Sequence, residues 1–217
     1  MGITDGMVKH CEISKTQISI GGPNRSGKST LARKLAKALA DVGCRAGLID
    51  VDMTRTSTFG RDEPILGTFD RATDEGKRLF ELQKKMQGWT YNNVFEVQIP
   101  LVSSVGAIPI FAATYANVLA YDRGESVAKR LGNRFVFFLL EATSFAEMCR
   151  RCEDDSLTTS DMHGGVASNP ALLENWENIN RRLSETYGTP FSRPLFRISQ
   201  GTPDEMLRQA MSRILNL

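Results

Sequence analysis

The 217-residue chain lacks a charge excess of either sign, because Lys+Arg 27 against Asp+Glu 25 leaves a formal net charge of +2. Dedicated nucleic-acid binders usually carry a marked basic excess, so we expect no nucleic-acid partner. Long apolar runs are also missing: the run at residues 135–140 is far shorter than the roughly 20 residues of a membrane span. Residues 1–14 contain no apolar stretch of signal-peptide length. We therefore expect a cytoplasmic protein without membrane contact.

Cysteine is scarce, and its four occurrences do not suggest a disulfide framework. Cys149 and Cys152 form a C-x-x-C, but it falls within a stretch with a helical pattern and no second pair completes a zinc site. We interpret all four as ordinary thiols of a reducing compartment. Internal repeats and low-complexity tracts are absent as well. The composition, 41% hydrophobic and 24% charged, is that of a globular protein, so we predict a single domain over residues 1–217.

Short apolar runs rich in β-branched and aromatic residues alternate with helical patterns. The runs cover residues 17–20, 46–51, 107–111, 134–140 and 194–198. Helices are predicted over residues 29–41, ending before Gly43, and over residues 203–215, with Thr202 as N-cap. This alternation is typical of a parallel sheet covered by helices on both faces. The prediction is a three-layer α/β fold with about five mostly parallel strands.

One motif indicates a ligand. Residues 22–29 read G-P-N-R-S-G-K-S and match G-x-x-x-x-G-K-[S/T] at every fixed position, between a predicted strand and a predicted helix. Glycines let the backbone N–H groups converge on phosphate oxygens, and the helix N-terminus attracts the same anion. Lys28 should reach the β- and γ-phosphates of ATP, and the Ser29 hydroxyl should ligate Mg²⁺. The predicted nucleotide-binding residues are Gly22, Asn24, Arg25, Ser26, Gly27, Lys28, Ser29 and Thr30.

Two carboxylates follow the second predicted strand. In a parallel sheet, Asp50 and Asp52 would lie at the same edge as the phosphate loop, where ligands collect. Asp52 could accept a proton from an attacking hydroxyl or hold a water on Mg²⁺, and Asp50 could contact substrate. Arg55 could pair with an anionic group. Alternatively, the two aspartates are strand-end and helix-capping residues without a catalytic role.

The phosphate loop, followed by a strand and then D-x-D-x-x-R at residues 50–55, resembles the small-molecule P-loop kinases. Adenylylsulfate kinase is the nearest pattern, and zeta-toxin-like and gluconate kinases are relatives. The resemblance implies a P-loop NTPase fold and transfer of the γ-phosphoryl group of ATP, with Mg²⁺, to a small acceptor. It also implies a helical acceptor-binding insertion at residues 53–105 and a lid with its following helix at residues 148–182. Arg123 sits where these kinases often place an arginine, and Arg150 and Arg151 correspond to lid arginines.

Two positions depart from this pattern. Ala112 stands where the third strand usually has an acidic residue, so Asp50 or Asp52 would have to serve the Mg²⁺ ion instead. Asp154 takes the place of the second lid arginine, although such sites work by neutralising negative charge. Either the register of the lid differs, or Arg25 supplies the second positive charge, or transfer is slow or absent.

The sequence thus predicts an ATP-dependent phosphotransferase with a small, anionic or neutral acceptor such as a nucleotide, adenylylsulfate or a sugar acid. The alternative is a regulatory nucleotide-binding NTPase module without a small-molecule acceptor. The sequence contains neither N-K-x-D nor an L-S-G-G-Q-like signature, which disfavours a GTPase switch and an ABC-type ATPase. The oligomeric state cannot be read from it.

Overall fold

A five-stranded sheet forms the centre of the computed structural model, which describes residues 13–22, 26–50, 73–112, 118–141, 143–144, 146–147, 150–151 and 195–216. The strands are β1 (Thr16–Gly21), β2 (Ala46–Asp50), β3 (Ile108–Ala112), β4 (Arg134–Leu140) and β5 (Leu195–Ile198). Their order is β2-β3-β1-β4-β5, and every pairing between them is parallel. The predicted parallel α/β fold is confirmed, with strand ends within a residue or so of the apolar runs. Within the described ranges, no helix combines the length and apolarity needed to cross a membrane.

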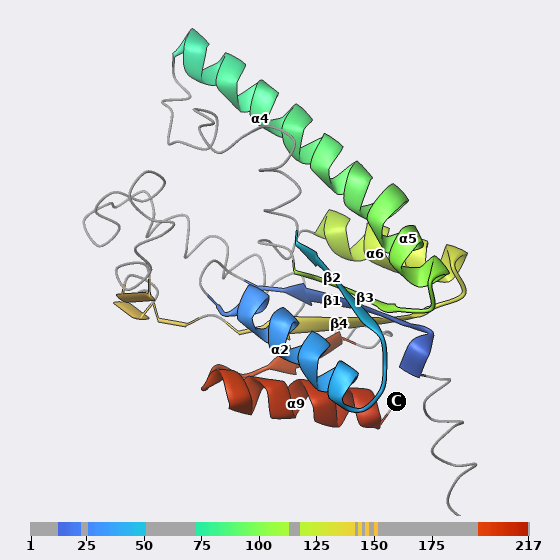
Figure 1. Cartoon of the computed structure of the whole chain (residues 1–217). Helices are drawn as coiled ribbons and strands as arrows, with labels where there is room; N and C mark the ends of the chain where they lie inside the picture. Colours follow the sequence, from blue (N-terminus) through green and yellow to red (C-terminus); the bar gives the residue numbers. More distant parts are fainter. Residues whose placement is uncertain are drawn as a thin grey trace, which may run out of the picture.

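Two helices, α2 (Lys28–Asp41) and α9 (Pro203–Leu215), cover one face of the sheet (Figure 1). The strand alternation of β1 turns Ile18 and Ile20 toward them. The apolar side chains that these helices bury recur every three to four residues: Leu31, Leu35 and Leu39 in α2, and Met206, Ala210 and Ile214 in α9. Because of this helical spacing, the apolar side chains of both helices face the sheet and form one continuous core with it.

The ends of both helices follow the predicted signals. Gly43 has φ 85° and its N–H donates to the carbonyl of Ala40 at 2.9 Å, which terminates α2. Thr202 caps α9 in a reciprocal arrangement, in which its hydroxyl accepts from the N–H of Glu205 and the Glu205 carboxylate accepts from the N–H of Thr202. Cys44, just after α2, is buried, and burial raises the pKa of its thiol. A buried thiol with a raised pKa is unreactive.

The opposite face is covered by α6 (Val118–Arg130), the π-helical η2 (Val94–Gln98) and α5 (Ile99–Ser104), whereas most of α4 (Asp74–Asn93), which runs into η2, projects beyond the sheet (Figure 1). A second apolar core lies on this face of the sheet, and Val94 and Phe95 of the π turn are both buried in it. There the Phe95 ring meets Phe111 of β3 edge to face, with the centroids 5.4 Å apart. The helical character predicted for residues 53–105 is confirmed over residues 74–104, and residues 51–72 lie outside the described part.

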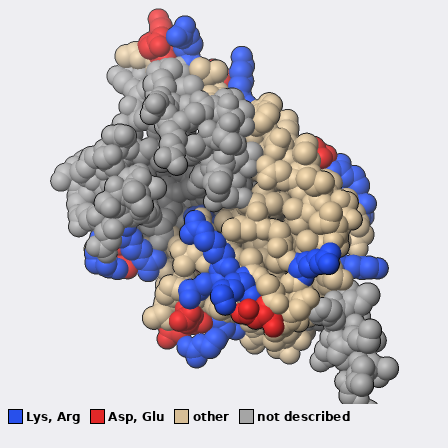
Figure 2. Space-filling view, in the orientation of Figure 1, with Lys and Arg blue, Asp and Glu red and all other residues tan. Residues whose placement is uncertain are grey.

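Charged side chains of both signs lie over α2 and α9 on the surface seen in Figure 2. Two ion pairs contribute to this mixture. Lys37 pairs with Asp41 within α2 at 3.3 Å, and Lys34 of α2 pairs with Asp204 of α9 at 2.7 Å. The second pair links the two helices across 170 residues of sequence. On this face, as in the whole sequence, positive and negative side chains therefore occur together.

Helix α5 packs closely against β2 at Gly47. A Cβ atom at Gly47 would lie 2.5 Å from Cγ1 of Val102, closer than real Cβ contacts allow. Gly47 has no unusual backbone angle, so the approach of α5 rather than the strand conformation requires the glycine. This contact fixes the distance between the edge strand and the helix that covers it.

We predict that Gly47→Ala destabilises the fold by about 1–2 kcal/mol, because the added methyl group overpacks against Val102. In a Val102→Ala background the same change should be neutral or stabilising, since the clashing atoms are gone. Urea unfolding of the two single variants and the double variant measures this coupling. Gly88→Ala, in α4 with nothing within 4 Å of its Cβ, is the matched control and should stabilise. An equal cost of Gly47→Ala in both backgrounds would contradict the packing argument.

Candidate functional site

The phosphate-loop motif begins where β1 ends. Gly22 is buried and has φ 148°, and a Cβ there would lie 2.9 Å from the carbonyl oxygen of Leu140. Gly27, at the start of α2, has φ 91° and ψ 14° in the left-handed region. Both glycines of the motif therefore occupy backbone conformations that L side chains rarely adopt. Asn24 and Arg25, two of the predicted nucleotide-binding residues, lie outside the described part of the chain.

The N-terminus of α2 begins at the phosphate loop. Gly27 is its N-cap and has no side chain to accept from the first N–H groups, and no acidic residue occurs in the first turn. The first N–H groups of a helix have no carbonyl partner within the helix, and the positive end of the helix dipole lies at the same end. Ser26 and Lys28 are buried, whereas Ser29 and Thr30 are exposed. The arrangement fits a phosphate group bound by backbone N–H groups, with two hydroxyls at the rim.

The sheet register places Ala112 and Asp50 side by side at the carboxyl edge. Ala112 is opposite Ile20 of β1 on one side and opposite Asp50 of β2 on the other. Asp50 is therefore one strand beyond the position where the kinase pattern has its acidic residue, and two strands from the loop. Asp52 and Arg55 follow β2 but lie outside the described residues. Among the described residues, no group of three or more His, Cys, Asp or Glu side chains could hold a metal ion.

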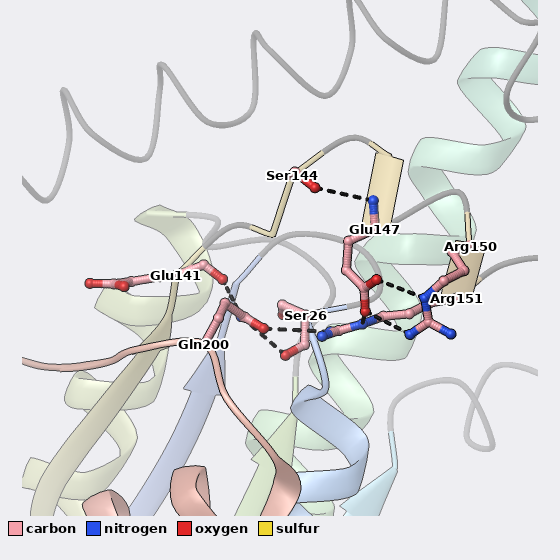
Figure 3. A network of polar contacts seen from close by, with 7 residues as sticks. All are labelled: Ser26, Glu141, Ser144, Glu147, Arg150, Arg151 and Gln200. Atoms are coloured by element: carbon pink, nitrogen blue, oxygen red, sulfur yellow. Dashed lines mark hydrogen bonds and ion pairs between the residues drawn. The ribbon is translucent and has the colours of Figure 1, made fainter.

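The two arginines assigned to the lid share one carboxylate (Figure 3). Arg150 donates to Glu147 with contacts of 2.8 Å, and Arg151 donates to it at 2.7 Å. The N–H of Glu147 in turn donates to the hydroxyl of Ser144. Hydrogen bonds from both guanidinium groups lower the pKa of Glu147 to about 2. Two guanidinium groups thus share the Glu147 carboxylate, and one of them, that of Arg151, also contacts Gln200 beside the loop.

Gln200 connects this lid cluster to the phosphate loop. It lies in the turn between β5 and α9, and its Nε2 donates to the Ser26 carbonyl at 3.4 Å and, by a shorter contact, to the Glu141 carbonyl. Its Oε1 accepts from Arg151 at 3.5 Å. Figure 3 shows the amide between these groups, whereas the Glu141 carboxylate points away. Gln200 was not among the residues predicted from the sequence. One signal could have indicated it: residues that follow a parallel strand lie at the same edge of the sheet as the phosphate loop, and Gln200 follows the fifth strand.

Arg123 lies in a different environment. It belongs to α6, donates to the Asn92 side chain at 2.7 Å and pairs with Glu96 at 3.9 Å. Its guanidinium also stacks 5.0 Å above the ring of Phe95. These partners come from α4 and η2, so the contacts of Arg123 hold α6 against the helices of the insertion.

No family model matches the sequence, and no curated protein matches it either. Solved structures do resemble it in fold. The APS kinase CysC of Mycobacterium tuberculosis, in complex with AMPPNP and APS, has a TM-score of 0.55 and 16% identity over 93% of this chain and 98% of its own. A gluconokinase from Sinorhizobium meliloti 1021 has a TM-score of 0.52 and 15% identity over 93% and 92%. The chain therefore has the three-layer α/β fold of the P-loop small-molecule kinases.

Proposed function

We propose that the protein is an ATP-dependent phosphotransferase that moves the γ-phosphoryl group to a small acceptor. The observation that carries the proposal is the loop between β1 and α2, with its two glycines at positive φ and a helix N-terminus that no side chain of the cap satisfies. Fold similarity to an APS kinase and a gluconokinase supports the same reaction class. Fold alone does not select a function, so the site chemistry has to carry it.

In this proposal, the chain acts chiefly by alignment and charge neutralisation. The N–H groups of the loop and of the first turn of α2 bind the β-phosphate, and Lys28 reaches the transferred group. A hydroxyl oxygen of the acceptor forms its bond to the γ-phosphorus as the bond to the bridging oxygen of ADP breaks. The acceptor proton passes to Asp52 or to a water that Asp52 holds.

The proposed site fits Mg²⁺ chemistry. Ser29 is exposed at the rim of the loop and would hold the ion together with Asp52 and the phosphate oxygens. When bound, Mg²⁺ would neutralise charge that develops on the phosphates during transfer. Asp50, opposite Ala112 in the register of β2 and β3, would compensate for the missing acid at that position. The site chemistry and the resemblance to the kinases both support these proposed Mg²⁺ ligands.

The acceptor is proposed to be a small molecule with a reactive hydroxyl, of the class of nucleotides, adenylylsulfate or sugar acids. Arg55 would contact an anionic group on it. Arg123 would contact it only by leaving Asn92 and Glu96, so we assign it mainly to packing of α6. Residues 53–105 would form the acceptor side of the site. A cytoplasmic location and the lack of a nucleic-acid partner remain part of the proposal.

The first prediction concerns Lys28. Lys28→Ala should lower kcat/KM for ATP by about 10²–10³-fold, because it removes the positive charge at the transferred group. ATP binding by calorimetry and ATP consumption with Mg²⁺ measure the effect. Lys37→Ala, an exposed lysine on the same helix paired with Asp41, is the control and should behave as wild type. Normal ATP binding and turnover by the Lys28 variant would show that the loop is not the nucleotide site.

The second prediction concerns Asp52. ATP consumption should rise with one compound from a panel of adenylylsulfate, nucleosides, nucleotides and sugar acids. Asp52→Asn should reduce that stimulated rate by about 10²–10⁴-fold while ATP still binds, because the asparagine cannot accept the acceptor proton. Asp74→Asn, at the exposed start of α4, is the control. Tight ATP binding with no stimulation by any compound would instead favour a regulatory nucleotide-binding module.

The third prediction concerns Glu147, which competes with phosphate for Arg150 and Arg151. Glu147→Gln should lower the KM for ATP about twofold to fivefold at low salt, because a neutral amide pairs less strongly with guanidinium groups. Since the pKa of Glu147 is about 2, its carboxylate stays charged down to about pH 4. The ratio of variant to wild-type KM should therefore be constant between about pH 5 and pH 8. A higher KM in the variant would show that Glu147 assists nucleotide binding.

A further inference from the structure

Gln200 is held in place by a turn built from several independent contacts. The Gln209 side chain of α9 accepts from the N–H of Ser199 at 3.0 Å and donates to its carbonyl at 3.2 Å. The capping box at Thr202 then fixes the start of α9, two residues after Gln200. The ion pair between Lys34 and Asp204 ties the same end of α9 to α2. Gln200 is therefore presented to the phosphate loop from a rigid support.

The surroundings of the Gln200 amide allow one orientation. The carbonyl oxygens of Ser26 and Glu141 can only accept, so they require the amide nitrogen on their side. The Arg151 guanidinium can only donate, so it requires the amide oxygen on its side. All three contacts are satisfied together, and reversing the amide would oppose all three. The direction of the hydrogen bond to Ser26 is thus set by its neighbours.

The contact to Ser26 acts on the peptide that joins Ser26 to Gly27. A trans peptide is planar and its C=O and N–H point in opposite directions, so fixing the Ser26 carbonyl toward Gln200 turns the Gly27 N–H to the opposite side. Rotating this peptide by about half a turn would carry φ of Gly27 to negative values, which glycine adopts as readily as its φ of 91°. Backbone preference alone therefore does not decide which group faces the loop.

We propose that Gln200 is a positioning residue that holds the Ser26–Gly27 peptide with its N–H, rather than its carbonyl oxygen, toward the bound phosphate. The inference rests on the nucleotide site of the proposed function. A carbonyl oxygen in that place would repel the anion that the loop is meant to bind. Through Oε1 the same amide contacts Arg151, so the peptide and one lid arginine are oriented by a single side chain from the far end of the sequence.

The test compares wild type with Gln200→Met, which keeps the shape of the side chain and removes both its donor and its acceptor. Titration with inorganic tripolyphosphate and with ATP should show affinity about tenfold weaker in the variant, by the same factor for both, since the peptide touches only phosphate. Gln200→Asn, which keeps the amide but shortens its reach, should give a smaller loss. Adding tripolyphosphate should shift the Gly27 amide proton resonance downfield in wild type and much less in Gln200→Met.

Gln209→Met is the matched control, because it also removes an amide that bonds to backbone in this turn but does not contact the loop. It should bind tripolyphosphate as wild type does. Equal affinities in wild type and Gln200→Met would overturn the inference, and so would an equal loss in Gln209→Met, which would make the effect one of turn stability. Failure of the wild type itself to bind ATP or tripolyphosphate would instead reject the nucleotide site of the proposed function.

Discussion

The parallel direction of the sheet is the constraint on which the rest of this molecule depends. Because all described strands run the same way, their carboxyl ends meet at one edge. The turn after β1, the end of β2 at Asp50, the end of β4 at Glu141 and the turn after β5 at Gln200 therefore converge from distant parts of the chain. Chemistry in such a fold is assembled at this edge by the sheet, while the two apolar cores hold the strands in register.

Charge at this edge suits the anionic ligand of the proposed function. The N-terminus of α2 has no acidic residue in its first turn, and the lid arginines face one carboxylate with a strongly lowered pKa. Glu147 limits the repulsion between Arg150 and Arg151. In the proposed function, a triphosphate would offer these guanidinium groups more negative charge than this carboxylate does. The two arginines would then exchange Glu147 for the nucleotide, which would bring their charge to the transferred group.

Sequence analysis predicted the fold closely because its signals are local. Apolar β-branched runs predicted the strands, helical patterns predicted α2 and α9, and Thr202 was predicted as the N-cap of α9, which the structure confirms. The π turn at residues 94–98 was not predicted, and its buried residues Val94 and Phe95 pack in one cluster with Phe111 of β3. Asp52 and Arg55 stay predictions because they lie outside the described residues. The partners of Arg123 could not be foreseen, because they come from helices about 30 residues earlier.

Gln200 shows why site residues of this kind escape sequence motifs. A motif records residues whose chemistry is needed at fixed spacing, such as the glycines and the lysine of the loop. An amide that orients a peptide 174 residues away needs only a rigid support and a neighbour on each side. Here the support is the capped start of α9, and the neighbours are Glu141 and Arg151. The glycines that let the loop close around phosphate also leave its peptides free to rotate, so a loop of this composition needs orientation from outside. The turn after β5 is close enough to supply it, because that strand ends at the same edge.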